Sequence, residues 1–263
     1  MPNIFILKLF LTPSLIGLAS LVERKWGAAI SGWLIGLPLS SAPIMLFLAL
    51  EHGTSFASDA ARSILLGLIS VAVFCLTYSW IALRFNWFPT VIAGWATFFT
   101  VTFFLQTAAL DAAAVLLFIG VSLVLSVTYA LLPKVRKHSL TTLIRPRWDV
   151  PLRMIIAAGF VFLLTGMANA LGPHLSGLLV PFPLFATILS VFTHRFQGSQ
   201  AVLSLLRGVV MGAFSFAVFF LTVALTIEPF GVASAFILAT VAALSLHGVT
   251  LLFLKRNQYE ENF

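Results

Sequence analysis

The strongest constraint on the fold is an internal repeat. When the sequence is shifted by 145 positions, residues 31–80 align with residues 176–225 without a gap, and fifteen of the 50 positions are identical. A duplication of this kind predicts two copies of one structural unit. The identical positions include glycines, prolines and arginines: Gly32 with Gly177, Pro38 with Pro183, Gly53 with Gly198, Arg62 with Arg207, and Gly67 with Gly212.

The composition places both copies in a bilayer. Hydrophobic residues make up 60% of the chain and charged residues 9%, whereas soluble domains carry about 25% charged residues. Apolar stretches long enough to cross about 30 Å of hydrocarbon as helices recur along the whole chain. We therefore predict an all-α polytopic membrane protein without a separate soluble domain. Its nine transmembrane helices are expected at residues 3–22, 27–50, 58–82, 88–107, 111–132, 150–170, 173–193, 200–226 and 229–254.

The basic residues orient these helices and explain the net charge of +7 without a nucleic-acid partner. Cytoplasmic loops of membrane proteins are rich in lysine and arginine, so the basic cluster after the fifth helix marks the cytoplasmic side. Because successive helices cross the membrane in opposite directions, we predict a bacterial inner-membrane protein with its N-terminus outside and its C-terminus in the cytoplasm. The cations assigned to the cytoplasmic side are Arg24, Lys25, Arg84, Lys134, Arg136, Lys137, Arg145, Arg147, Arg195, Lys255 and Arg256.

The repeat period of 145 residues contains five predicted helices, which is an odd number. The second copy is therefore expected to enter the membrane upside down, as an inverted-topology repeat. Helices one to four form the first copy, over residues 1–110. The fifth helix and a cytoplasmic linker occupy residues 111–149, and helices six to nine form the second copy, over residues 150–263.

Two pairs of cations recur at equivalent positions of the copies: Lys8 with Arg153, and Arg62 with Arg207. If Ser199 caps its helix, Arg207 lies about 12 Å along the axis, inside an apolar segment. One interpretation is that these side chains snorkel to lipid headgroups, which is favoured for Lys8 and Arg153 near helix ends. The other is that Arg62 and Arg207 face an aqueous cavity that attracts an anion.

A glycine–proline element in the second and seventh helices predicts where a ligand would bind. Proline inside a helix leaves backbone groups unpaired, and such interruptions at matching places of two repeats indicate a central site. The alternative is a simple kink with small residues for close helix packing. The candidate substrate-binding residues are Arg62, Arg207, Ser40, Ser41, Gly36, Pro38, Pro181, Pro183, Gly32 and Gly177.

Three further residues are candidates for carrying a coupling proton: Glu51, His52 and His247. Histidine titrates near neutral pH, and Glu51 and His52 are adjacent at the end of the second helix. The alternatives are a solvated helix end for Glu51 and His52, and a hydrogen bond within the bundle for His247. Known catalytic and metal-binding motifs are missing from the sequence, so we predict neither an enzyme nor a cofactor or metal site. The single Cys75 can form no disulfide within the chain.

The stretch Leu175-Ser-Gly-Leu-Leu-Val-Pro-Phe-Pro-Leu-Phe-Ala, with the later Gly198 and the segment from Arg207 to Gly212, resembles the small GlpM-type bacterial membrane proteins. Those proteins are about half as long, so the resemblance implies a fused duplicate in a bacterial inner membrane. It supplies no substrate. The first copy departs from the pattern at Gly36, where the second has Pro181. The architecture is also similar to the doubled helical units of drug/metabolite transporters.

These observations lead to a hypothesis and two alternatives. The chain is expected to be a small secondary transporter or exporter of an anionic small molecule or amphipathic anion, working by alternating access between its copies. The alternatives are a membrane structural or assembly subunit without transport, and an intramembrane enzyme acting on a lipid. Substrate specificity is expected where the copies differ. These positions are Ser40 and Ser41 against Phe185 and Ala186, and Glu51 and His52 against Phe196 and Gln197. The expected partners are the lipid bilayer and the anionic substrate, and a homodimer is left open.

Overall fold

The structure is a computed structural model that describes residues 2–39, 41–107, 112–135, 146, 148–160, 162 and 182–260. Helices joined by short turns make up this part of the chain, so the all-helical prediction is confirmed. The helices are α1 (Pro2–Trp26), α2 (Ala28–Ile35), α3 (Ser41–His52), α4 (Thr54–Ile81), α5 (Trp87–Thr107), α6 (Ala114–Leu131), α8 (Leu184–Gln197) and α9 (Ser199–Glu260), and residues 149–160 are also helical.

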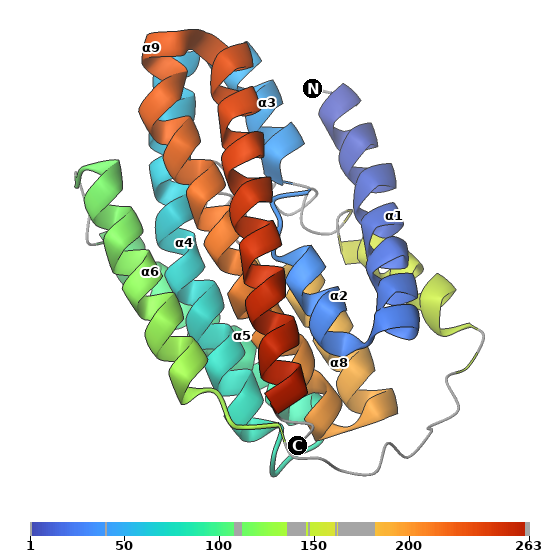
Figure 1. The fold of residues 1–263 in the computed structure, drawn as a ribbon. Coiled ribbons are helices and arrows are strands. Elements are labelled where there is room, and N and C mark those ends of the chain that lie inside the picture. Colours follow the sequence, from blue (N-terminus) through green and yellow to red (C-terminus); the bar gives the residue numbers. More distant parts are fainter. Residues whose placement is uncertain are drawn as a thin grey trace.

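The helices run up and down between two ends of a bundle, and α2 and α3 follow each other in the same direction (Figure 1). The lower end, as drawn, carries Trp26, Leu131 and Gln197, where α1, α6 and α8 finish, and the upper end carries Gly53 and Gly231. Although α9 is one continuous assignment, Gly231 has the non-helical angles φ 76° and ψ 173°. It divides α9 into an ascending arm, residues 199–230, and a descending arm, residues 232–260.

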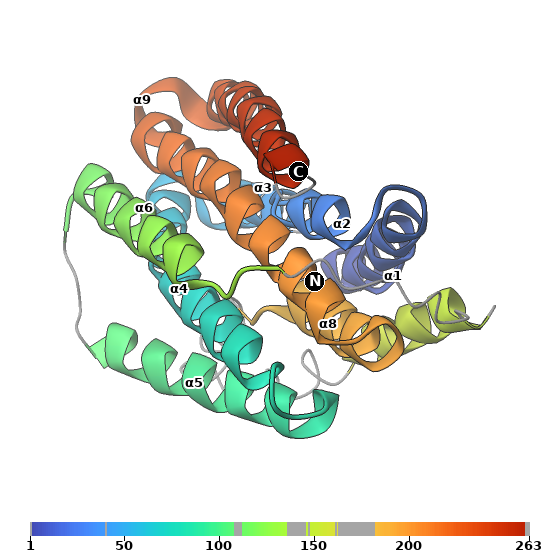
Figure 2. The same cartoon turned by 60° about the horizontal axis from the view of Figure 1, so that its bottom comes forward.

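The interior is formed by α4 and the ascending arm of α9, which pack against each other (Figure 2). On the same view, α5 and α6 flank α4, while α2 lies against α9 on the other side. Small side chains face inward along the descending arm, where Ala235, Ala239 and Ala243 follow one another at intervals of four and are buried. This spacing puts all three on one helix face and allows close approach of the neighbouring helix.

Four of the described helices are long and apolar enough to cross a membrane: residues 54–81, 87–105, 114–131 and the two arms of 199–252 taken together. Large apolar side chains point outward from them, including Leu123 and Ile237, each 64% exposed. A water-soluble protein rarely exposes so much apolar surface, so these faces fit a membrane protein. The expected span at residues 27–50 is two helices, α2 and α3, because the chain leaves the helical conformation after Ile35.

Equivalent positions of the repeat make equivalent helix junctions. Gly53 joins α3 to α4 with φ 89° and ψ 174°, and Gly198 joins α8 to α9 with φ 85° and ψ −178°. Only glycine adopts such a positive φ without strain, which explains why glycine stands at both positions. The two glycines that the sequence alignment pairs therefore have nearly the same backbone conformation.

Paired polar side chains extend this correspondence beyond the aligned segments. Thr102 on α5 donates a hydrogen bond to Ser70 on α4, with 2.8 Å between the oxygens. At the positions 145 residues later, His247 Nδ1 and Ser215 Oγ form a hydrogen bond of 3.1 Å between the two arms of α9. A hydrogen bond thus joins α4 to α5 at the positions equivalent to those that join the two arms of α9.

Candidate functional site

The interruption between α2 and α3 has the same hydrogen bonds as the start of α8. In the first copy, Leu39 N–H donates to the carbonyl of Leu37, and Ala42 N–H donates to the carbonyl of Pro38, both at 2.8 Å. The second copy repeats both bonds at the shifted positions. Leu184 N–H donates to Phe182, and Thr187 N–H donates to Pro183, again at 2.8 Å. The proline in each copy therefore makes the same turn.

The angles of Pro183, φ −77° and ψ 60°, define this turn as an inverse γ-turn. Proline suits the position because its ring fixes φ near this value and it has no N–H that would need a partner. Pro38 and Pro183 are both buried, and Ser41 at the start of α3 is half-buried. The predicted residues Ser40, Gly177 and Pro181 lie outside the described part of the chain.

Gly32 and Gly36 lie at a crossing where α2 touches α9 backbone to backbone. A Cβ atom at Gly32 would lie 1.9 Å from the carbonyl oxygen of Leu205, and one at Gly36 would lie 2.4 Å from the Cα of Gly212. On the facing helix, a Cβ at Gly208 would lie 2.1 Å from the carbonyl oxygen of Ala29. The Cβ sides of both α2 glycines therefore face protein, as close packing requires.

The two candidate arginines lie at opposite ends of the bundle, so the structure does not bring them together. Arg207 at the lower end donates from one guanidinium nitrogen to the carbonyls of Leu132 and Pro133, each at 3.2 Å, and lies 4.7 Å over the ring of Tyr129. These carbonyls follow α6, so the cation lies at the negative end of that helix. In the described part of the chain, the backbone carbonyls after α6 therefore bind the Arg207 guanidinium.

Arg62 at the upper end makes weaker contacts than Arg207 does. One of its guanidinium nitrogens lies 3.9 Å from the carboxylate of Asp59, whose side chain is 74% exposed. The Nε atom of Arg62 is buried and has no hydrogen-bond partner within the described residues. Exposed ion pairs of this kind contribute about 0–1 kcal/mol, so the Arg62 side chain is loosely held.

The structure does not bring His247 together with the other two proton-coupling candidates. Glu51 and His52 are both exposed at the upper end. His247 is 3% exposed, and its ring stacks on Trp33 with 3.6 Å between the ring centroids. The Nε2 atom of His247 is buried and lacks a hydrogen-bond partner in the described residues. The structure therefore shows the alternative given above for His247, a hydrogen bond within the helix bundle, here to Ser215. The other ring nitrogen has no partner among the described residues.

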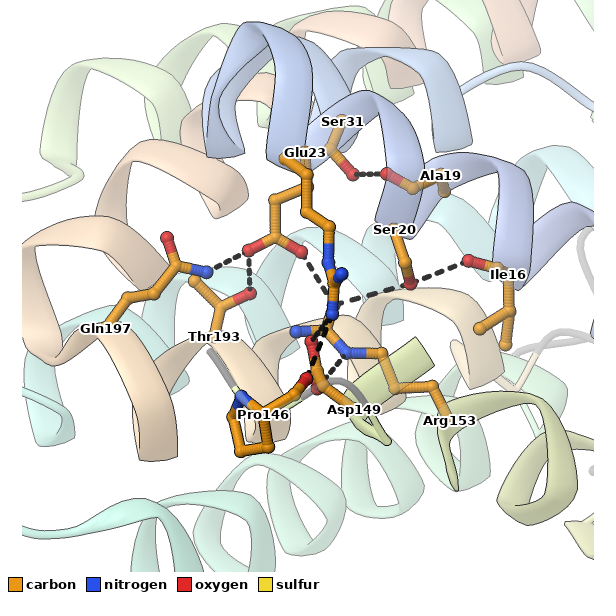
Figure 3. A network of polar contacts seen from close by, with 11 residues as sticks. Ile16, Ala19, Ser20, Glu23, Ser31, Pro146, Asp149, Arg153, Thr193 and Gln197 are labelled. Carbon is orange, nitrogen blue, oxygen red and sulfur yellow. Dashed lines mark hydrogen bonds and ion pairs between the residues drawn. The ribbon is translucent and has the colours of Figure 1, made fainter. Parts of the chain in front are cut away.

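The most extensive polar cluster lies at the lower end and centres on Glu23, the last acidic residue of α1 (Figure 3). Arg153 donates to Glu23 Oε2 with 2.6 Å between nitrogen and oxygen. From α8, Thr193 Oγ1 donates to Glu23 Oε1 at 2.9 Å, and the Gln197 amide donates to the same oxygen. Both carboxylate oxygens of Glu23 are thus engaged by the other copy.

A second carboxylate completes this cluster, which we call the lower ion network and define as Glu23, Arg24, Asp149, Arg153, Thr193 and Gln197. Asp149 accepts a hydrogen bond of 2.9 Å from Arg153 Nε, and its other oxygen lies 3.6 Å from Arg24. The side chains of Glu23 and Arg153 are 1% exposed and that of Asp149 is 2% exposed. Arg153 pairs with both buried carboxylates, and Arg24, whose side chain is 33% exposed, supplies a second positive charge at the edge of the network, so each buried charge has a partner.

Sequence reasoning missed most of this network. Glu23 precedes the basic residues Arg24 and Lys25, and Asp149 follows a polar linker, so both resemble solvated charges at helix ends. The snorkelling interpretation of Arg153 is wrong, because the guanidinium turns inward to two carboxylates and lies 5.1 Å from the ring of Phe192. The available signal was the four-residue spacing of Asp149 and Arg153, which places opposite charges on one helix face.

The described residues therefore define an all-helical bundle of apolar helices, with an interrupted helix in its interior and a buried ion network at one end. Within them, no group of three or more metal-ligating side chains gathers. No protein family, no curated protein and no solved structure matches this chain. The resemblance to GlpM-type proteins remains a prediction from the sequence.

Proposed function

We propose that the chain is a multi-pass membrane transporter that moves a small anion by alternating access between two inverted copies. The observation that carries the proposal is the interrupted helix of the first copy, whose hydrogen bonds at Leu39 and Ala42 recur at Leu184 and Thr187. Interrupted helices at matching places of two repeats are typical of transporters, where the unpaired backbone groups line the substrate site. The site would lie beside these two turns.

The direction of the helices supports an inverted relationship between the copies. In Figure 1, α4 descends from Gly53, whereas the ascending arm of α9 rises from Gly198, although the two glycines are equivalent in the repeat. The expected orientation, with the lower end in the cytoplasm of a bacterium, follows from the basic residues there. This orientation predicts that a reporter enzyme fused to the C-terminus is active if it functions in the cytoplasm, and inactive if it functions only outside the cytoplasm.

Two features favour an anion. Each of the two proline turns is followed by the N-terminus of a helix, α3 at Ser41 and α8 at Leu184, whose first N–H groups attract negative charge. In addition, each end of the bundle carries a half-buried arginine within an apolar helix, Arg62 on α4 and Arg207 on α9, and a cation in such a position is a candidate to meet an anion. Arg62 is the freer of the two to meet an incoming anion, since Arg207 already binds the end of α6.

One observation favours a structural subunit without transport. The backbone contact of Gly32 and Gly36 with α9 is the kind of tight crossing that holds two helices rigidly together. The two functions differ in what happens around this crossing. The crossing joins the two copies, so in a transporter the copies would have to move about this crossing as a pivot, whereas a structural subunit would keep both proline turns closed at all times.

Accessibility of the two interruptions tests the proposal. In a Cys75→Ala background, Ser41→Cys and Ala186→Cys place thiols at equivalent positions of the copies, and Leu123→Cys on the outer face of α6 provides a control. A membrane-impermeant thiol reagent is applied from each side of oriented vesicles. For a transporter, we expect Ser41→Cys and Ala186→Cys to react from both sides and an anion to change the two rates in opposite directions. Reaction from one side only, unaffected by a panel of carboxylates and phosphates, would favour the structural subunit.

Flux measurements provide the complementary test. The purified protein is reconstituted into liposomes, and uptake of radiolabelled acetate, benzoate and phosphate is compared with protein-free liposomes. A transported anion should also raise the unfolding temperature of the protein, because it binds the folded state. If no anion in a broad panel is transported or stabilises the protein, the proposed function is wrong.

A further inference from the structure

We propose that the polar face of α8 lines the path by which a monovalent anion moves between the Pro183 turn and the lower end of the bundle. The inference rests on the proposed function and adds to it the route of the substrate, the groups that bind it on the way and the charge that it carries. The polar face of α8 consists of Thr187, Ser190, Thr193, His194 and Gln197.

The α8 helix is buried although one of its faces is polar. With about 3.6 residues per turn, the five side chains of this face fall within about a third of the helix circumference. Four of them are among the buried residues, and the opposite face is apolar, with Ile188 and Phe192 packed against α1 and residues 149–160. In a membrane protein, polar groups turned to the interior have to meet protein partners, water or a ligand.

Ser190 is the residue of this face that lacks a partner. Its side chain is 0% exposed, and its hydroxyl has no hydrogen-bond partner in the part of the chain that the structure describes. A serine inside a helix can donate to the carbonyl four residues earlier, and Ser20 and Ser245 do so in this protein. Since the Ser190 hydroxyl makes no such bond, it is available to a ligand that passes along α8.

Two further donors beside the polar face are held by long contacts. The indole N–H of Trp95 on α5 donates to Thr187 Oγ1 at 3.3 Å, and the hydroxyl oxygen of Tyr78 on α4 lies 3.5 Å from His194 Nδ1. Both distances exceed the usual range for hydrogen bonds in proteins. An anion accepts stronger hydrogen bonds than a neutral group does, so it can take over both donors as it passes.

The donors along this path are neutral, which favours an anion with a single charge. The one arginine of α8, Arg195, is exposed on another side of the helix, where its guanidinium lies 5.6 Å from the ring of Trp87. The cost of taking an ion out of water rises steeply with its charge. Pores for phosphate accordingly use arginine and lysine, so a path of neutral donors suits a monovalent anion.

The lower ion network closes the lower end of this path. Thr193 and Gln197, the members of the polar face nearest that end, both donate to the Glu23 carboxylate (Figure 3). Neither donor is available to an anion until the Glu23 side chain leaves α8. The structure therefore corresponds to a state that is closed below, with the Ser190 hydroxyl enclosed between the Pro183 turn and the network.

Thiol labelling compares the two faces of α8. In a Cys75→Ala background, Ser190→Cys exchanges oxygen for sulfur on the polar face, and Ile188→Cys is the control on the apolar face, where Ile188 is 3% exposed. A membrane-impermeant, negatively charged thiosulfonate reagent is added to inverted vesicles. We expect Ser190→Cys to react at least about tenfold faster than Ile188→Cys, and benzoate to slow only the reaction of Ser190→Cys. Equal rates for both thiols would overturn the path.

Removing the hydroxyl measures its contribution to anion binding. Ser190→Ala should weaken the binding of benzoate about two- to tenfold, which is the effect of one neutral hydrogen bond. Ser126→Ala on the exposed face of α6 removes only a bond to a carbonyl of its own helix and should leave binding unchanged. Isothermal titration of the purified proteins measures both. Benzoate binding that is the same in Ser190→Ala as in the unsubstituted protein would contradict the proposed role of Ser190.

Flux into liposomes separates this inference from the proposed function. At about pH 8, where phosphate carries close to two charges, uptake of benzoate above that of protein-free liposomes should exceed uptake of phosphate. Faster uptake of phosphate would overturn the assignment to a monovalent anion. Benzoate uptake with an unreactive Ser190→Cys would overturn the path along α8 but keep the transporter. A reactive Ser190→Cys in a protein that neither binds nor moves any anion would overturn both.

Discussion

The lower and upper ends of this bundle share a backbone and differ in chemistry. At the lower end, Glu23 and Arg153 join the two copies through contacts that water does not reach. At the upper end, the carboxylates of Glu51, Asp59 and Glu228 are exposed, and Arg62 and Asp59 form only a distant pair. The difference arises from the side chains, because the glycine junctions at the two ends have nearly the same angles.

The repeat makes this difference explicit at equivalent positions. Shifting the lower-network residues Asp149, Arg153, Thr193 and Gln197 back by 145 positions gives Ile4, Lys8, Leu48 and His52. At these positions the first copy also has a cation, Lys8. It has apolar residues in place of the carboxylate of Asp149 and the hydroxyl of Thr193. A symmetrical backbone with one ion-paired end is suited to a protein whose two ends open under different conditions.

The largest expected effect comes from removing the central cation of the lower end. Arg153→Met leaves Glu23 and Asp149 buried without their common partner, and breaking a buried pair in this way costs about 3–5 kcal/mol of stability. The equivalent change at the upper end, Lys8→Met, should cost less than about 1 kcal/mol if that side chain snorkels. Chemical unfolding in detergent micelles measures both. Equal losses would mean that the ends do not differ as described.

Removing one neutral donor from Glu23 should have a smaller effect at the same end. Thr193→Val deletes a hydrogen bond to a buried carboxylate, and such bonds contribute about 1.5–3 kcal/mol. Thr240→Val on the exposed face of α9 removes only a bond to the carbonyl of Phe236 in its own helix and serves as the control. The loss for Thr193→Val should largely vanish in a Glu23→Gln background, because the carboxylate is then absent. An undiminished loss there would point to packing around Thr193 instead.

The all-helical fold and its apolar helices could be predicted from the sequence, because long apolar stretches can be recognised directly along the chain. The interruption at Pro38 was expected from proline chemistry, and α3 does begin shortly after it. The lower ion network could not be predicted, because Glu23 and Arg153 are 130 residues apart and each resembles an ordinary charge near a helix end. Likewise, only the crossing of α2 and α9 reveals that Gly32 serves packing.

The junction glycines test whether the backbones of the two ends are really equivalent. Gly53→Ala and Gly198→Ala each force a side chain into a positive φ with an extended ψ, a conformation almost restricted to glycine that costs about 1–3 kcal/mol for other residues. Apart from the glycine and its two neighbours in the chain, no atom of the structure lies within 4 Å of the added Cβ at either position, so the cost arises from the local backbone and not from packing. Equal losses at the two ends, within experimental error, are expected in unfolding experiments. A large inequality would show that the repeat holds in sequence but not in structure.

The smallest expected effect is at the upper end, where the ion pair is exposed. Asp59→Asn removes a carboxylate 3.9 Å from Arg62, and surface pairs of this kind contribute about 0–1 kcal/mol. Added salt should reduce even that difference, because exposed charges are screened over about 8–10 Å at physiological ionic strength. The lower ion network should respond far less to salt, since its charges are buried. Unfolding of Asp59→Asn and Thr193→Val measured at low and high salt therefore compares the ends directly. A salt-sensitive loss for Thr193→Val would mean that water reaches Glu23, and the lower end would then not be closed.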